Sequence, residues 1–132
     1  MSKFYRYIKK GIIQSLSNIP FHGKAPIKRL LMLKKCLIPK SDMHIAVHFI
    51  KNLPKKIPKY SELHKHDCDE INLILSENKK LVYNVQLENE IYRVSSPATV
   101  FIPKGTRHST EVLSGEGIFV CIILKSKYKS MK

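Results

Sequence analysis

Acidic residues are almost missing from the first 60 positions of this 132-residue chain, which contain fourteen Lys or Arg and only Asp42 as an acid. Residues 61–124 reverse the balance with six basic and nine acidic side chains, and the last eight residues add four lysines. The net charge of +14 therefore lies towards the two ends of the sequence. Such segments can act as electrostatic arms for nucleic acid, anionic lipid or an anionic partner. Because the positive charges are scattered, we favour a solvated surface over contact with nucleic acid or a membrane.

Long apolar runs are also missing. None approaches the roughly 18–20 residues that a bilayer-spanning helix needs, and the N-terminus has no continuous apolar stretch typical of a signal peptide.

Cysteine is scarce as well. The chain has only Cys36, Cys68 and Cys121, and their spacing suggests no pairing. An odd count without a secretory signal is typical of reduced thiols, so we expect a cytoplasmic protein. With 43% hydrophobic residues, the chain can bury a core as one domain.

Residues 1–42 are expected to form a basic segment, made of a helix and a connector, that packs on the main domain. Apolar side chains recur at spacings of three or four along residues 3–19, which predicts an amphipathic helix: Phe4, Ile8, Ile12, Leu16 and Ile19. Such a helix can lie on a membrane or dock on a partner, but packing on its own domain is the more common role. Residues 27–38 fit either a short helix or a strand.

A change of period at residue 43 predicts a β domain over residues 43–124. In residues 43–50 two sets of side chains alternate as in a strand, with Ile45, Val47 and Phe49 on one face and His44, Ala46 and His48 on the other. Five more β-rich runs follow between turn clusters, at residues 70–75, 80–87, 90–94, 99–103 and 117–124. Many short strands at this spacing predict an all-β sandwich or barrel. Residues 125–132 are expected to be a basic tail that frays.

The stretch "HKHDCDE", residues 64–70, carries the clearest functional signal. Side chains two positions apart on a strand point to the same face, so His64 and His66 can reach one metal ion while Lys65 points away. Glu70 has the same parity, and a strand or tight turn can bring its carboxylate to the same ion. Three ligand-capable side chains in one short stretch predict a metal site that takes its fourth ligand from elsewhere.

A second stretch, "PKGTRH" at residues 103–108, supplies that candidate ligand. Pro103 ends a predicted strand, Gly105 permits a tight turn with positive φ, and His108 can enter the next strand pointing inward. Together the patterns HXHXXXE and PXGXXH resemble the two sequence motifs of the cupin superfamily. The resemblance covers roughly residues 43–124.

The resemblance implies an RmlC-like, single-domain cupin, whose fold is a double-stranded β-helix or jelly-roll barrel. It also implies a homodimer and a complete set of four metal ligands, namely His64, His66, Glu70 and His108. The positions that flank the ligands depart from the motifs: Tyr60 or Lys59 stands near the leading glycine of the first motif and Glu77 at its trailing glycine, while Pro97 and Val112 replace a glycine and an asparagine of the second. These departures lie in turns and leave the ligand set intact.

Three imidazoles and one carboxylate are borderline ligands that suit Fe(II), Mn(II), Ni(II), Co(II) or Zn(II), and they are too rich in nitrogen for Mg²⁺ or Ca²⁺. Four protein ligands leave two positions of an octahedron open to water, substrate or dioxygen. We therefore expect a catalytic site rather than a structural one, with Fe(II) as the favoured ion. A barrel that retains these side chains without a metal, or uses them to bind an organic ligand, is the alternative. Cys68 is either a fifth ligand or, more simply, a small apolar filler.

Five residues are weaker candidates for substrate binding: Asn72, Arg107, Tyr83, Tyr92 and His48. Asn72 shares the parity of Glu70 and can hydrogen-bond a substrate. Arg107 can bind a carboxylate or phosphate, although its parity opposes that of His108. Both tyrosines either line the barrel mouth or pack in the ordinary way. His44 and His48 share a face but are roughly 13 Å apart along a strand, so they cannot chelate one ion together, although one of them can line the pocket.

These features favour a small mononuclear metal-dependent enzyme that acts on a chelating small molecule, with an oxygenase as the leading hypothesis. Two alternatives remain open. One is a non-redox isomerase, epimerase or lyase on a sugar or keto acid, in which a side chain moves the proton. The other is a cupin that binds or senses a small molecule without catalysis, although residues 1–42 show no clear helix-turn-helix pattern.

Overall fold

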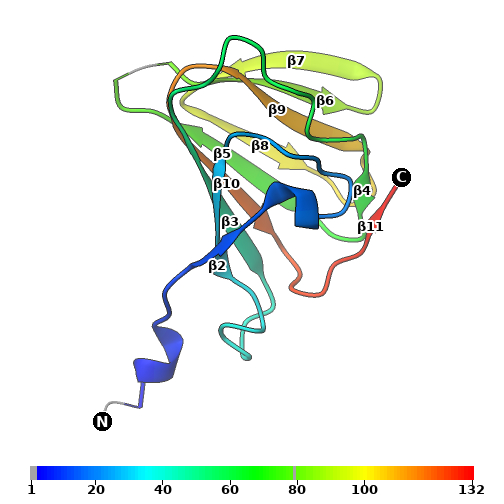
Figure 1. Cartoon of the computed structure of the whole chain (residues 1–132). Coiled ribbons are helices and arrows are strands. Elements are labelled where there is room, and N and C mark those ends of the chain that lie inside the picture. The colour runs from blue at the N-terminus through cyan, green and yellow to red at the C-terminus, as the bar shows by residue number, and fades with distance from the viewer. Residues whose placement is uncertain (1–2, 79) are drawn as a thin grey trace.

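The structure is a computed structural model that describes residues 3–78 and 80–132 (Figure 1). Nearly all regular structure in these residues is β-strand, and the exceptions are two single 3-10 turns, η1 (Tyr5–Tyr7) and η2 (Leu16–Asn18). Within the described part of the chain, no helix is long and apolar enough to cross a membrane. The predicted all-β class is confirmed.

The larger sheet has six antiparallel strands, and their order in space differs from their order in the chain. The order is β1 (Ile12–Gln14), β2 (Lys28–Leu33), β3 (His44–Ile50), β10 (Gly117–Ile123), β5 (Glu70–Leu75) and β8 (Ala98–Ile102). β10, near the end of the chain, therefore pairs with both β3 and β5. This insertion of a late strand between early ones is the crossing pattern of a jelly roll.

A second layer closes the barrel. It has three strands in the order β7 (Glu90–Ser95), β6 (Val82–Leu87) and β9 (His108–Ser114), and a two-stranded ribbon of β4 (Lys65–His66) and β11 (Ser130–Met131) lies at one end of it. Figure 1 shows this layer facing the six-stranded sheet, so that the two enclose an interior. The runs predicted as strands at residues 70–75, 80–87, 90–94, 99–103 and 117–124 form β5, β6, β7, β8 and β10.

One part of the interior is a close-packed apolar cluster, which we call the apolar half. Tyr83 and Phe119 stack at its centre with ring centroids 4.6 Å apart. Its other buried members come from both layers and from η2: Leu16, Ile50, Tyr60, Ile74, Leu81, Val85 and Val112. Burying each large apolar side chain contributes about 1.5–3 kcal/mol, so this cluster supplies much of the free energy that holds the two layers together.

The two histidines of β3 point into the interior. They share one face of the strand with Ala46, and this face is covered by the rest of the barrel. His44, Ala46 and His48 are buried, whereas Phe49 on the opposite face is partly exposed. The register pairs His48 with Arg29 of β2 on one side and with Phe119 of β10 on the other. The inner face of the sheet is therefore polar near β2 and β3, while its outer face carries apolar side chains.

The helix predicted over residues 3–19 is wrong. This segment forms η1, then β1, then η2, and Phe4 and Ile8 are 59% and 73% exposed. The apolar residues recur at helical spacing, but β1 instead pairs with the free edge of β2, and Leu16 alone of the stripe is fully buried in the core. Tertiary pairing thus overrides the local pattern.

The boundary predicted at residue 42 is corrected as well. Residues 27–38, which fitted either a helix or a strand, contain β2, and this strand pairs with β3 along its length. Because β1 and β2 extend the six-stranded sheet, the barrel begins near residue 12 rather than residue 43. Only residues 3–11 lead away from it, as the blue segment in Figure 1 shows.

The tail at residues 125–132 does not fray. Asp67 anchors it, because its carboxylate accepts hydrogen bonds from Lys125 Nζ at 2.8 Å and from the backbone N–H of Lys129 at 2.8 Å. Ser126 is fully buried, and its hydroxyl accepts a hydrogen bond from the backbone N–H of Lys35 at 2.9 Å. These contacts bring β11 beside β4, next to the predicted metal ligands.

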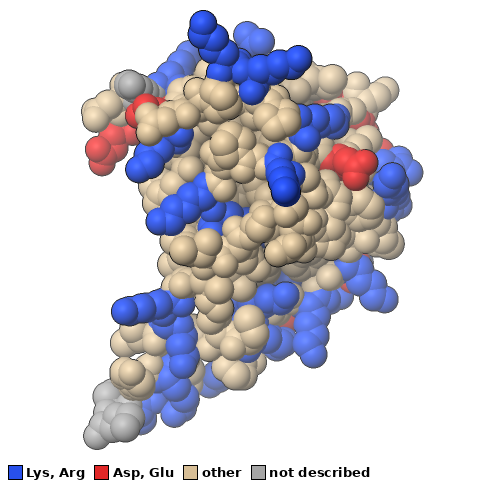
Figure 2. Space-filling view, viewed as in Figure 1, with Lys and Arg blue, Asp and Glu red and all other residues tan. Residues whose placement is uncertain are grey.

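Basic side chains are dispersed over the surface in Figure 2. On the face shown, Lys and Arg side chains are spread over most of the surface, and they adjoin one another along the upper edge and the N-terminal segment. Acidic side chains are few on the same face.

Candidate metal centre

His64, the residue before β4, lies directly opposite His108, the first residue of β9, at one end of the interior. The backbone N–H of His64 donates to the carbonyl of His108 at 3.1 Å, and the N–H of His108 donates to the carbonyl of His64 at 2.7 Å. A residue pair that exchanges both hydrogen bonds in this way is held in fixed register. The two imidazoles consequently project side by side, with ring centroids 4.6 Å apart.

A tight turn at residues 103–106 sets the position of His108. Gly105 has a φ of +80°, and the backbone N–H of Thr106 donates to the carbonyl of Pro103 at 3.0 Å. This positive φ is the reason for glycine at that position. The N–H of Gly105 also donates to the carbonyl of His66 at 3.0 Å, which docks the turn against β4.

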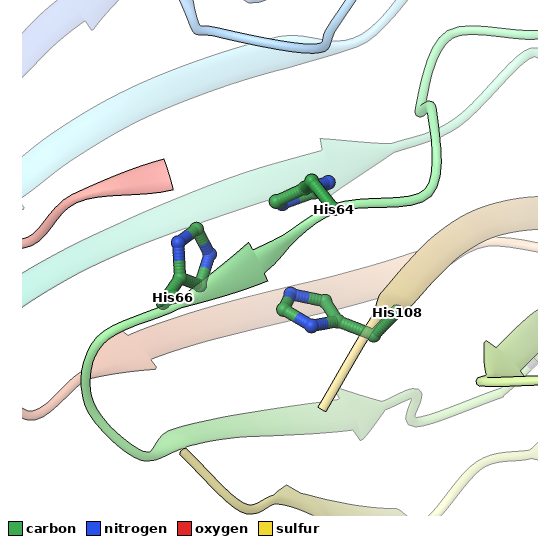
Figure 3. Close-up of side chains that lie close together, drawn as sticks. All are labelled: His64, His66 and His108. Atoms are coloured by element: carbon green, nitrogen blue, oxygen red, sulfur yellow. The ribbon is translucent and has the colours of Figure 1, made fainter. Parts of the chain in front are cut away.

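The three histidines converge on one point. One ring nitrogen each of His64, His66 and His108 lies within 4.8 Å of the others, and all three side chains are buried. Figure 3 shows the three rings facing one another from β4, from the residue before it and from the start of β9. The grouping predicted from the sequence is therefore present for the histidines.

Hydrogen bonds at the outer nitrogens orient these rings. Nδ1 of His64 lies 2.6 Å from the carbonyl oxygen of Glu62, and Nδ1 of His108 lies 2.9 Å from that of Thr106. A carbonyl only accepts, so both Nδ1 atoms carry the proton and both Nε2 atoms of the neutral rings keep a lone pair. The third ring, of His66, has its Nδ1 3.1 Å from the hydroxyl of Ser130 in β11.

Glu70 lies beside the histidines at the start of β5. Its Oε1 is 3.1 Å from Nε2 of His66 and 3.3 Å from Nε2 of His108. Its Oε2 accepts a hydrogen bond from Nδ2 of Asn72 at 2.8 Å and lies 3.6 Å from Sγ of Cys121. One carboxylate oxygen is thus held by the barrel wall and the other faces the imidazoles.

The site favours a charged carboxylate at Glu70 and a neutral imidazole at His64, whereas the pKa of His108 is raised because burial is outweighed by its contact with the Glu70 carboxylate. Burial disfavours the charged form of Glu70, but the Nε2 atoms of His108 and His66, 3.3 and 3.1 Å from its Oε1, favour that form more strongly and hold the pKa of Glu70 well below its usual range. Burial lowers the pKa of His64 to about 4, so that this ring is neutral at physiological pH. Neutral imidazole and ionised carboxylate are the forms in which these groups bind a metal.

The side chains fit a divalent transition metal. Nε2 of His108 is buried and has no hydrogen-bond partner among the described residues, although the Glu70 carboxylate is nearby. Each imidazole has its other nitrogen held by a carbonyl or hydroxyl oxygen, which is the outer arrangement found for most metal-binding histidines. Three histidines are thus positioned to bind a metal, and the donor set leaves its identity open.

A small cavity of about 40 Å³ opens beside these ligands. Five of the six histidines in the chain line it, since His22 and His48 join the three that converge. Arg29, Cys121 and Tyr128 complete much of its wall. We call this region the polar half of the interior, because charged and hydrogen-bonding side chains replace the close packing of the apolar half.

Of the five weaker candidates, only His48 lines the cavity. Asn72 is fully buried, but it bonds the Glu70 carboxylate and so positions a ligand rather than meeting substrate. Tyr83 packs in the apolar half because its inward parity on β6 places it against Phe119. The structure therefore does not place either of these two side chains on the cavity wall, and for Tyr83 ordinary packing is the reading that fits.

Two other candidates lie on the surface. Arg107 pairs with Glu88 through an Nη1 to Oε1 contact of 3.1 Å, and both side chains are about half exposed. Its opposite parity to His108 points it outward, as the alternation of a strand requires. Tyr92 is exposed on β7 and donates to the Glu90 carboxylate at 2.8 Å. Cys68 is absent from the cavity wall, where the thiol is that of Cys121.

Four residues of the polar half escaped prediction: Arg29, His22, Tyr128 and Ser130. Tyr128 packs edge-on against the rings of His66 and His44, with centroids 4.9 and 5.2 Å away. Its position depends on the folded tail, for which the lysine-rich sequence gives no periodic signal. Arg29 lies in the stretch that fitted either a helix or a strand, so the sequence did not predict whether its side chain points to the interior or to solvent.

Two of the departures from the cupin motifs, Tyr60 and Val112, are in contact. Tyr60 is buried, and its hydroxyl accepts a hydrogen bond from the backbone N–H of Val112 at 2.8 Å. The backbone N–H of Tyr60 in turn donates to the Glu111 carboxylate at 2.9 Å. Tyr60, near the expected leading glycine of the first motif, thus ties the loop before His64 to β9.

Comparison with solved structures confirms the fold. An RmlC-like cupin from Shewanella frigidimarina NCIMB 400 is 13% identical, with a TM-score of 0.59 over 89% of this chain and 86% of that one. A cupin-2 domain from Rhodospirillum rubrum is 14% identical, with a TM-score of 0.57 over 91% and 73% of the two chains. A mutant of oxalate decarboxylase from Bacillus subtilis is 15% identical, with a TM-score of 0.55 over 92% and 31%. The chain therefore has the cupin barrel fold.

No protein-family model matches the chain, and no curated protein matches it in sequence. At this level of identity the structural likeness extends to the fold alone, and the chemistry has to be argued from the site.

Proposed function

We propose that this protein is a mononuclear metal-dependent enzyme that acts on a small chelating molecule. The observation that carries the proposal is the convergence of three imidazoles whose Nε2 atoms face one point while their Nδ1 atoms are held from outside. The presence of Glu70 at 3.1–3.3 Å from two of these nitrogens supports it as the fourth ligand. A divalent transition ion is the cofactor, and Fe(II) is the ion we favour.

A dioxygen-dependent oxidation is the reaction class that we favour. An ion held by four protein ligands keeps positions open for substrate, and a bound Fe(II) supplies both Lewis acidity and reactivity towards dioxygen. The protein itself supplies a small enclosed cavity, which limits the entry of water, and a carboxylate oriented by Asn72. These features hold a substrate in one orientation next to the ligands.

A non-redox isomerase or lyase is the second candidate, and His22 favours it. Nδ1 of His22 lies 2.8 Å from the carbonyl oxygen of Pro20, so this nitrogen donates and Nε2 keeps its lone pair. The ring lines the cavity 5.4 Å from that of His64, and burial lowers the pKa of His22. A neutral histidine in this position is suited to accept a proton from a bound substrate.

We also propose that two copies of the chain pair through the outer face of the six-stranded sheet. Phe49, Ile118 and Leu75 are direct cross-strand neighbours on β3, β10 and β5, and all three are partly exposed. Contiguous apolar side chains on an exposed face are typical of an interaction site. The same face of a second copy is its natural complement, because a twofold dimer joins identical surfaces.

The experiment that tests the function is metal analysis combined with oxygen uptake. Protein purified without a histidine tag is analysed for Fe, Mn, Co, Ni and Zn, and the Fe(II)-loaded form is then supplied with chelating acids, enediols and catechols. We expect one metal ion per chain and oxygen uptake with one of these classes. Stoichiometric zinc or nickel without oxygen uptake in any loaded form favours the second candidate, and the His22→Gln variant then tests the proton acceptor.

A further inference from the structure

Arg29 is a buried cation whose direct partners are all uncharged. Its side chain is 4% exposed at the inner face of β2. Nε donates to Oε1 of Gln14 at 3.1 Å, Nη1 donates to Nε2 of His48 at 2.8 Å, and Nη2 donates to Nε2 of His44 at 3.4 Å. Within residues 3–78 and 80–132, Arg29 forms no ion pair.

Such an arrangement is unusual for a structural arginine. Arginine is almost never fully buried unless it is paired, because removing the charge from water without an opposite charge is costly. The two imidazoles do not supply that charge. Burial, reinforced by Arg29, lowers the pKa of His48 to about 3 and that of His44 to about 4, so both rings are neutral acceptors.

The guanidinium of Arg29 also has N–H groups that its three contacts do not use. Arginine has five N–H groups in a planar fork, and the three contacts to Gln14, His48 and His44 use one on each nitrogen. One N–H on each of Nη1 and Nη2 is left. These N–H groups can bind an anionic oxygen, and hydrogen bonds between a guanidinium and a carboxylate are of the strong, charge-assisted kind.

Arg29 faces the same cavity as the metal ligands. It lines the cavity together with His64, His66 and Glu70. β2 and β5 are separated by β3 and β10 in the sheet, so three strand spacings of about 4.8 Å place their backbones about 14 Å apart. The long arginine side chain covers part of that gap from β2, and Glu70 projects from β5 of the same sheet. A small molecule between them would meet both.

We propose that Arg29, supported by His48, His44 and Gln14, forms a carboxylate-binding subsite in the cavity that the metal ligands also line, and that the substrate is a small carboxylic acid that extends from Arg29 to the metal site. This inference rests on the proposed function for the metal-binding end only. The carboxylate provides the negative charge that the buried guanidinium lacks. The four side chains fix the substrate orientation, and they do so without taking part in bond making.

The charge of the site favours carboxylate over phosphate. The single guanidinium of Arg29 offsets the single charge of a carboxylate, whereas a phosphate monoester carries about −1.5 to −2 charges at neutral pH. The cavity that Arg29 and the metal ligands line is small, at about 40 Å³. Short carboxylic acids of a few carbons are therefore the expected ligands.

The test compares three small ligands on folded protein loaded with Zn(II). Malonate has a carboxylate at both ends, acetohydroxamate chelates metal through its two hydroxamate oxygens but has no carboxylate, and inorganic phosphate supplies the competing anion. Calorimetry is carried out on the wild type, on Arg29→Gln, on Arg29→Lys and on the surface control Arg93→Gln, which lies on exposed β7. We expect Arg29→Gln to weaken malonate binding roughly ten- to hundredfold, the range for a hydrogen-bonded charged pair. Acetohydroxamate binding, zinc content and the Arg93→Gln control stay unchanged.

A measurement on the wild type removes dependence on any variant. The chain has four arginines, Arg6, Arg29, Arg93 and Arg107, so their Nε–H signals can be followed by ¹⁵N NMR. Malonate should shift the Arg29 signal strongly, while acetohydroxamate leaves it in place and phosphate shifts it less than malonate does. A stationary Arg29 signal during saturation by malonate overturns the subsite, as does equal malonate affinity in folded Arg29→Gln.

The two proposals fail in different ways. If the protein holds no metal but malonate still shifts Arg29 in the metal-free form, the carboxylate subsite stands and the metal-dependent function falls. If zinc binds fully and malonate affinity is independent of Arg29, the metal site stands and the subsite falls. A stronger response to phosphate than to malonate also contradicts the carboxylate assignment.

Discussion

The interior of this barrel is divided between an apolar half around Tyr83 and Leu81 and a polar half around Glu70 and Arg29. The apolar half is packed without charged side chains, whereas the polar half holds an ionised carboxylate, a guanidinium and five cavity-lining histidines. Both are enclosed by the same strands, and β3 contributes Ile50 to one and His48 to the other. The difference indicates that stability is concentrated in one half, which leaves the other free to hold groups that are costly to bury.

The largest expected effect is on stability, and it falls in the apolar half. Leu81 is fully buried in the cluster, so Leu81→Ala should lower the free energy of unfolding by about 2–5 kcal/mol. The matched change Leu113→Ala, at a partly exposed position of β9, should cost less than about 1 kcal/mol. Urea denaturation measures both, and metal content per folded chain should be the same in each. Equal losses of unfolding free energy in the two variants would contradict the conclusion that stability is concentrated in the apolar half.

The next effect falls in the polar half and changes metal affinity. Ser130 orients His66 through the 3.1 Å contact between its hydroxyl and Nδ1, so Ser130→Ala should weaken metal binding roughly tenfold to hundredfold. The control Ser114→Ala changes an exposed serine at the end of β9 and should leave affinity unchanged. Competition with a chromophoric chelator measures the two constants. Identical affinities would show that the tail has no part in the site.

A third comparison is between two exposed surfaces, the outer face of the six-stranded sheet and the exposed face of β7. Ile118→Lys should convert a dimer to a monomer, because it places a charge among Phe49 and Leu75. The control Ile91→Lys puts the same charge on the exposed face of β7 and should leave the dimer intact. Sedimentation at micromolar concentration distinguishes the two, and a monomeric wild type would refute the proposed pairing.

The smallest expected effect is at Arg107. Its contact with Glu88 is an exposed ion pair, which contributes about 0–1 kcal/mol. Arg107→Gln should therefore change stability by that amount or less, and should leave both zinc content and malonate affinity at wild-type values. A loss of malonate binding like that expected for Arg29→Gln would mean that the sequence-based assignment of Arg107 to the substrate was right after all.

The sequence predicts the centre of this fold well because alternation is strong there. The run at residues 70–75 predicts a strand and forms β5 with the same bounds, and the HXHXXXE and PXGXXH patterns lead to the three convergent histidines. The ligands could be found because their spacing in the chain matches the parity of short strands joined by tight turns.

The two ends of the chain could not be predicted, because long-range pairing decides their structure. The apolar spacing along residues 3–19 is helical, yet β1 forms because β2 offers a free edge. The tail has four lysines, but Asp67 and β4 order it. In the sequence Arg29 does not differ from the other basic residues. Only the strand register, which pairs it with His48, shows that it faces the interior. Such information lies in contacts between distant segments rather than in local pattern.

The most direct test of the central claim is the metal content of the His64→Ala/His108→Ala double variant. The measurement uses elemental analysis of untagged protein after loading and desalting, beside the wild type and Lys65→Ala, whose side chain is not among the converging ligands. We predict one transition-metal ion per chain in the wild type and in Lys65→Ala, and none in the double variant with its fold retained by circular dichroism. Unchanged stoichiometry in the folded double variant would contradict the assignment of this site as the metal centre.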